Sequence, residues 1–104
     1  MMLYLDDNRE TPNGWVRTYT VEETKIQLST RTVTHLSVDN DLGSEDPKEE
    51  GYQVLDWLEE QVFLDPTFPI PEIEVHTSNS SRLQYMRMVA RRLETMRQQQ
   101  TDEE

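Results

Sequence analysis

Aspartates stand at the ends of two separate apolar segments of the sequence. Asp6 and Asp7 come directly after an apolar run at residues 1–5. Asp39 and Asp41 follow a second apolar run. Because the crevice of a doubly wound sheet lies beyond the carboxyl ends of neighbouring strands, we expect three or four of these carboxylates to converge on one pocket. Crowded carboxylates need a cation or shared protons, and oxygen-only ligands favour Mg²⁺ or Mn²⁺. The sequence therefore predicts a metal site.

Acids after strands also have a purely structural explanation, since carboxylates are common N-caps and turn residues. Two strands that each end in paired acids favour the metal site over that explanation, whereas Asp41 alone fits either role. Asp39 is a candidate catalytic residue in two ways. It is either a metal ligand or a nucleophile that forms an aspartyl phosphate, and the sequence leaves both open.

A second polar group follows the last apolar segment, in the stretch V-H-T-S-N at residues 75–79. His76 is a candidate general acid or base, because histidine is the side chain best suited to exchange protons near neutral pH. Ser78 and Asn79, with the amides that open the next helix, are suited to hold an anion, although helix capping is the alternative. We predict that His76 is catalytic and that Ser78, Asn79 and Asn40 bind substrate.

The elements that position these residues are predicted to alternate between strands and helices. Apolar patterning predicts helices at residues 21–29, 50–64 and 83–96, and strands at residues 1–5, 15–19, 33–38 and 72–77. The first connection is turn-rich and lacks a helix. Such alternation favours a small three-layer α/β domain with a mainly parallel four-stranded sheet. The strand order 2-1-3-4 would make the first and third strands neighbours.

Length and composition exclude several classes of protein. The chain has 104 residues and no cysteine, so disulfides and thiolate metal sites are impossible. We expect one domain over residues 1–97 and a polar tail at residues 98–104. No apolar run approaches the roughly 20 residues that span a bilayer, and the first residues do not resemble a signal peptide. We therefore expect a cytoplasmic protein with no membrane contact.

The net charge of −11 at pH 7 opposes binding to the backbone of bulk DNA and favours divalent cations. An acidic mimic of nucleic acid is another class consistent with this charge. Two features oppose mimicry: four acids stand at motif positions, and five bases gather within residues 82–97. The charge thus agrees best with a metal site.

Five stretches in order along nearly the whole chain form a specific combination, at residues 3–9, 11–17, 36–43, 51–58 and 76–79. In these stretches the chain resembles the cyclic-phosphate processing receiver domain family, an offshoot of the response-regulator receiver fold. The resemblance implies a receiver-like, flavodoxin-like fold with metal-binding acids at Asp6 and Asp7. Asp39 matches the position that accepts a phosphoryl group in true receivers. His76 and Asn79 match polar residues characteristic of the family.

The resemblance implies a metal-dependent phosphoesterase that acts on a cyclic phosphate, either an RNA end or a cyclic nucleotide. The alternative is a binding module that holds a cyclic nucleotide, an RNA end or a protein partner without turnover. Two departures keep this alternative open. The family usually carries a histidine where this chain has Asn40, and tends toward proline and glycine where this chain has Ser80 and Ser81.

Overall fold

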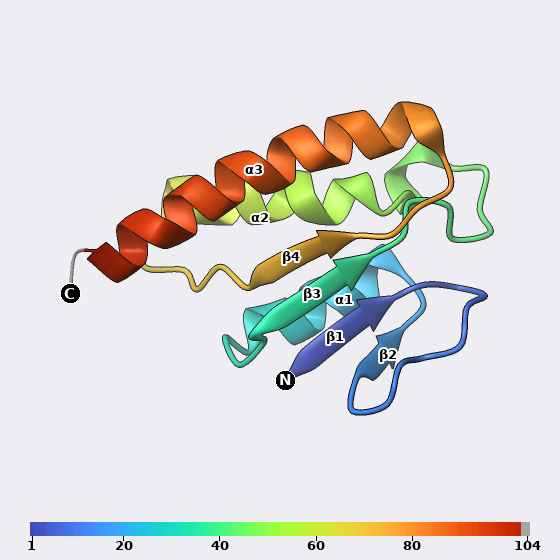
Figure 1. The fold of residues 1–104 in the computed structure, drawn as a ribbon, viewed down its shortest axis with the longest axis horizontal. Coiled ribbons are helices and arrows are strands. Elements are labelled where there is room, and N and C mark those ends of the chain that lie inside the picture. Colours follow the sequence, from blue (N-terminus) through green and yellow to red (C-terminus); the bar gives the residue numbers. More distant parts are fainter. Residues whose placement is uncertain (103–104) are drawn as a thin grey trace.

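Four short strands pair in parallel in the order β2-β1-β3-β4 in the computed structural model, which describes residues 1–102 (Figure 1). The predicted α/β class, parallel sheet and strand order are confirmed. Because β1 and β3 are neighbours at the centre, the segments that follow them leave the sheet side by side. The strands are β1 (Met2–Leu5), β2 (Val16–Thr18), β3 (His35–Val38) and β4 (Glu72–Val75).

The first helix begins at a local sequence signal. At the start of the first helix, the Thr20 hydroxyl accepts the amide of Glu23 at 3.1 Å, as its capping sequence predicts. A short 3₁₀ helix, η1 (Pro47–Glu49), lies in the segment between β3 and the second α-helix. The α-helices are α1 (Val21–Ser29), α2 (Tyr52–Leu64) and α3 (Ser80–Asp102).

Within the described residues, no helix combines the length and apolar character needed to cross a membrane.

The apolar core lies between the helices and one face of the sheet. Successive side chains of a strand point to opposite faces. On one face, Leu3 and Leu5 of β1 and Leu36 and Val38 of β3 are fully buried, in a cluster with apolar residues of α1, α2 and α3. In Figure 1, α1 lies behind the sheet, and α3 runs along α2 and β4.

Within residues 1–102 no helix lies over the opposite face of the sheet, and α3 runs along its β4 edge (Figure 1). The physical reason is the connection between β1 and β2, whose turn residues form a loop. This loop partly covers the face: the Trp15 ring meets the rings of Tyr4 and His35 edge-on, with centroids 6.2 and 6.3 Å apart. The face without a helix is therefore lined by aromatic and polar side chains.

Helix α3 continues through Asp102, past the predicted boundary at residue 97. The predicted tail is thus helical over residues 98–102, and its last two positions lie outside the described residues. Gln100 anchors this part of the helix, since its Nε2 donates to the carbonyl oxygens of Pro66 and Phe68 at 3.0 and 2.7 Å. The polar sequence of residues 98–102 did not predict a helix there, because the partners of Gln100 are more than 30 residues away in the sequence.

Replacement of Gln100 tests this anchor. Gln100→Ala should lower the free energy of unfolding by about 1 kcal/mol, because two carbonyl groups lose their shared donor. The matched control is Gln99→Ala, which removes an exposed glutamine from the same turn. Urea denaturation measures both. Equal stability of the two variants would contradict the anchoring role.

Candidate functional site

The carboxylates that follow β1 and β3 meet at the carboxyl edge of the sheet. The amide of Asp39 donates to the carbonyl oxygen of Leu5 at 2.9 Å, which extends the pairing of the two strands to the first acid. One oxygen from each of Asp6, Asp7 and Asp39 lies within 4.8 Å of the other two. We call these three residues the carboxylate group. Three of the four predicted metal ligands therefore converge.

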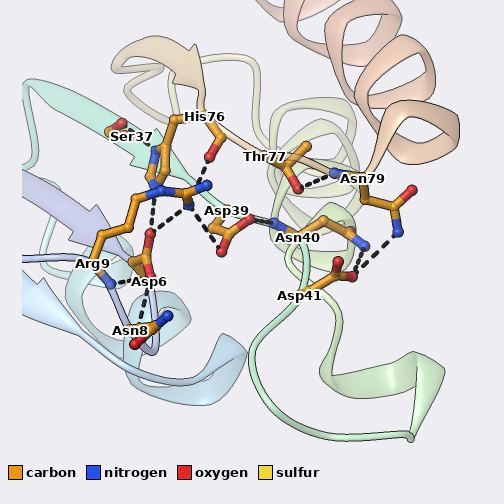
Figure 2. Close-up of polar contacts among 10 residues, drawn as sticks. All are labelled: Asp6, Asn8, Arg9, Ser37, Asp39, Asn40, Asp41, His76, Thr77 and Asn79. Atoms are coloured by element: carbon orange, nitrogen blue, oxygen red, sulfur yellow. Dashed lines mark hydrogen bonds and ion pairs between the residues drawn. The ribbon is translucent and has the colours of Figure 1, made fainter.

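Asp6 is fully buried, and each of its carboxylate oxygens accepts two hydrogen bonds (Figure 2). Oδ1 accepts the amides of Asn8 and Arg9 at 2.8 and 2.9 Å. Oδ2 accepts Nη1 of Arg9 and Nε2 of His76, both at 2.9 Å. Burial by itself raises the pKa of Asp6, but these hydrogen bonds outweigh it and hold the pKa well below its usual range. Asp6 is thus ionised and fixed in orientation.

The guanidinium of Arg9 lies between two of the carboxylates. Its Nη1 is 2.9 Å from Oδ2 of Asp6, 3.3 Å from Oδ2 of Asp39 and 3.1 Å from the carbonyl oxygen of His76. The hydrogen bond to Asp6 raises the pKa of Arg9, so the group stays cationic. Arg9 is a site residue that the sequence patterns did not identify. Arg9 follows Asp6 by three residues, a spacing typical of an ion pair within a turn. This spacing was the one feature of the sequence that could have identified Arg9.

His76 is held at both ring nitrogens. Nε2 contacts Oδ2 of Asp6, and Nδ1 lies 2.7 Å from the hydroxyl oxygen of Ser37. Because a carboxylate only accepts hydrogen bonds, Nε2 must carry a proton. The ring also stacks on Tyr4, with centroids 4.5 Å apart and planes 4° from parallel. In this geometry His76 positions Asp6, and its predicted catalytic role stays a prediction.

Ser37 and Tyr4 are two further site residues that the sequence patterns did not identify. Each stands between two fully buried apolar residues of a strand, in L-S-V and L-Y-L. Strand alternation places both on the face opposite the helices, which is the face that His76 also occupies. The alternation of polar and apolar residues in these strands indicated that Tyr4 and Ser37 face away from the core. The sequence did not show that this face lacks a helix, so their role in the site could not be recognised.

A second polar group lies beside the carboxylate group and contains Asp41 (Figure 2). The Nδ2 of Asn40 donates to Asp41 at 3.2 Å and to Glu50 at 2.8 Å, and its Oδ1 accepts the amide of Tyr52 at 3.0 Å. Asn40 is fully buried, and its side-chain amide forms its hydrogen bonds within the protein. These bonds fix the start of α2. The predicted contact of Asn40 with substrate stays a prediction.

Asn79 and Ser78 lie at the start of α3. The Oδ1 of Asn79 accepts the amide of Arg82 at 3.1 Å, which is a helix-capping contact, and its Nδ2 donates to Asp41 at 3.3 Å. Ser78 is exposed next to it. Asn79 therefore contacts Asp41 instead of the carboxylate group, and the predicted substrate contacts of Asn79 and Ser78 stay predictions.

Two glycines allow the loop before α2 to approach the site. A Cβ atom at Gly51 would lie 1.8 Å from the carbonyl oxygen of Asp39, so only glycine fits there. Gly43 has a φ of +83°, and a Cβ at this position would lie 3.0 Å from Oδ2 of Asp7. The loop is thus packed against the carboxylate group at both of its ends.

The carboxylate group fits a hard divalent cation. Its donors are all oxygens, which Mg²⁺ and Mn²⁺ prefer. In addition, the guanidinium of Arg9 already lies between two of the carboxylates, at a place where positive charge is favourable. Asp6, Asp7 and Asp39 are the residues that would hold the cation.

A scan against protein-family models matches the cyclic-phosphate processing receiver domain over residues 1–92. The chain belongs to this family. The match includes the whole sheet and both polar groups, and it ends within α3. No curated protein and no solved structure matches the chain at a significant level. The resemblance seen in the sequence is therefore confirmed, and the carboxylate group belongs to a cyclic-phosphate processing receiver domain.

The pH dependence of stability tests the state of Asp6 in this receiver domain. The pKa of Asp6 is lower in the folded protein than in the unfolded chain, where it is about 3.9. Asp6 therefore stabilises the fold above that pH, and the contribution is lost as the pH falls toward the folded pKa. We expect the difference in unfolding free energy between the wild type and Asp6→Asn to shrink between about pH 5 and pH 3.

Urea denaturation across this pH range provides the measurement. The control is Glu60→Gln, which neutralises an exposed acid of α2 and should differ little from the wild type at any of these pH values. A difference between wild type and Asp6→Asn that does not change with pH would contradict the ionised, hydrogen-bonded state of Asp6.

Proposed function

We propose that this receiver domain is a metal-dependent phosphoesterase that opens a cyclic phosphate, at an RNA end or in a cyclic nucleotide. The observation that carries the proposal is the convergence of Asp6, Asp7 and Asp39 at the carboxyl edge of β1 and β3. Membership in a family described by cyclic-phosphate processing supplies the substrate class.

Electrostatics supports a cation as part of this function. A phosphodiester is an anion, and it approaches three carboxylates only if positive charge lies between them. Arg9 supplies one positive charge at this place. A divalent cation, Mg²⁺ or Mn²⁺, would supply two more and would neutralise charge that develops on the phosphate.

Opening of a cyclic phosphodiester adds one water molecule. An oxygen–phosphorus bond forms, the bond from phosphorus to one ring oxygen breaks, and that oxygen takes up a proton. Asp39 is nearly buried, and its Oδ1 accepts the amide of Asn40 at 2.8 Å, which fixes the direction of Oδ2. Asp39 then acts as a cation ligand or as the nucleophile. His76 donates that proton to the ring oxygen after Nε2 leaves Asp6, and it regains a proton from the attacking water. On the nucleophile route this water hydrolyses the aspartyl phosphate in a second step.

A receiver-like binding module without turnover is the second candidate function. One observation favours it: both ring nitrogens of His76 are bonded within the protein, so neither is free for proton transfer in this geometry. The amide of Asn40 is bonded within the protein in the same way. Such a domain would hold a cyclic nucleotide, an RNA end or a protein partner.

Turnover by the Asp39→Asn variant tests the proposal. The substrates are 2′,3′-cyclic nucleotides, 3′,5′-cyclic nucleotides and cyclic oligonucleotides, each with and without Mg²⁺ or Mn²⁺. We expect metal-dependent turnover of one class by the wild type and a loss of at least about 100-fold in Asp39→Asn, as for removal of one electrostatic group from an active site.

The control for that experiment is again Glu60→Gln, which removes the same charge from an exposed position on α2. Circular dichroism should establish that each variant is folded. Unchanged turnover in folded Asp39→Asn would rule out hydrolysis at this site. Saturable binding of a cyclic phosphate with no product would instead select the binding module.

A further inference from the structure

Arg9 covers the two carboxylate oxygens that a cation would need. The other oxygen of each carboxylate is committed to the backbone: Oδ1 of Asp6 accepts two amides, and Oδ1 of Asp39 accepts the amide of Asn40. Oδ2 of Asp6 accepts no backbone amide, although it accepts Nε2 of His76, and Oδ2 of Asp39 is likewise free of the backbone. Nη1 of Arg9 lies 2.9 and 3.3 Å from these two oxygens. Because Nη1 already contacts both of these oxygens, a cation held by Asp6 and Asp39 would compete with the guanidinium for them.

The side chain of Arg9 is able to leave this position while its backbone stays. The side chain is 44% exposed, whereas the amide is tied to Oδ1 of Asp6 at 2.9 Å. Asp6 would keep its two backbone donors and His76, and the cation would replace the charge of the guanidinium. The anchored backbone keeps the displaced guanidinium at the rim of the site.

A guanidinium at that rim is suited to bind phosphate. Its planar set of donors matches two phosphate oxygens at once. Charge balance points the same way, because the three carboxylates carry three negative charges, while Arg9 and a divalent cation together carry three positive ones. With both cations present, the site no longer repels an anionic substrate.

We propose that Arg9 and a divalent cation exclude one another at Oδ2 of Asp6 and Asp39, and that Arg9, once displaced, binds the substrate phosphate. This inference rests on the proposed function and adds to it a phosphate-binding residue that is available only in the cation-loaded domain. Arg9 thereby makes phosphate binding depend on the cation.

Calorimetric titration with Mn²⁺, without any substrate, tests the competition. Removal of an internal competitor raises the apparent affinity, so Arg9→Ala should bind Mn²⁺ at least about tenfold more tightly than the wild type. The charge-matched control is Arg91→Ala, which removes an exposed arginine of α3 and should change the affinity by less than about twofold, because its distant charge is screened. If Arg9→Ala does not fold, Arg9→Gln serves instead, since it keeps a neutral donor for Asp6.

Titration with inorganic phosphate at saturating Mn²⁺ tests the second half of the proposal. The wild type should bind phosphate, and Arg9→Ala should bind it at least about tenfold more weakly, because a charge-assisted bidentate contact is lost. The same control variant, Arg91→Ala, should match the wild type. We therefore expect Arg9→Ala to raise the affinity for Mn²⁺ and to lower the affinity for phosphate.

The possible results separate this inference from the proposed function. If the wild type binds Mn²⁺ and Arg9→Ala binds it equally well, competition is excluded and the metal-dependent function stands. If phosphate binding is unchanged in Arg9→Ala, the phosphate role of Arg9 is overturned. If neither protein binds Mn²⁺, both this inference and the metal-dependent function fail.

Discussion

The buried carboxylate of Asp6 is the constraint on which the site depends. An ionised carboxylate without partners inside a protein costs several kcal/mol, so its four hydrogen bonds are a condition of the fold. They join the end of β1 to its own loop, through Asn8 and Arg9, and to the end of β4, through His76. Ser37 and the ring of Tyr4 hold His76 in turn. One buried charge thus organises three segments that are distant in sequence.

The absence of a helix from one face of the sheet, within residues 1–102, explains how these polar partners reach Asp6. The connection after β1 is a loop, so Arg9 is free to turn back over the ends of the strands, and Trp15 covers Tyr4. On the opposite side, Gly51 lets α2 begin directly against the backbone of Asp39. The same edge of the sheet is therefore closely packed beneath the carboxylates and partly exposed above them.

The fold and the meeting of the carboxylates could be predicted because they depend on local patterns. Apolar runs that end in acids identify β1 and β3, and the order of a parallel sheet places Asp6 beside Asp39. The remaining features depend on partners distant in sequence. Arg9 forms an ion pair with Asp39, and Oδ1 of Asn40 accepts the amide of Tyr52. The C-terminal part of α3 contacts the loop after α2. No single stretch of sequence contains both members of these pairs.

The most direct test of a specific cation site follows the ¹H–¹⁵N NMR signals of the protein during titration with Mg²⁺. We predict saturable shifts confined to the backbone amides of residues 6–9 and of Asp39, together with a change at the side-chain Nε of Arg9 as the guanidinium leaves the carboxylates. Shifts that do not saturate, or that spread evenly over the acidic surface, would show diffuse attraction of cations and would contradict a site built around Asp6.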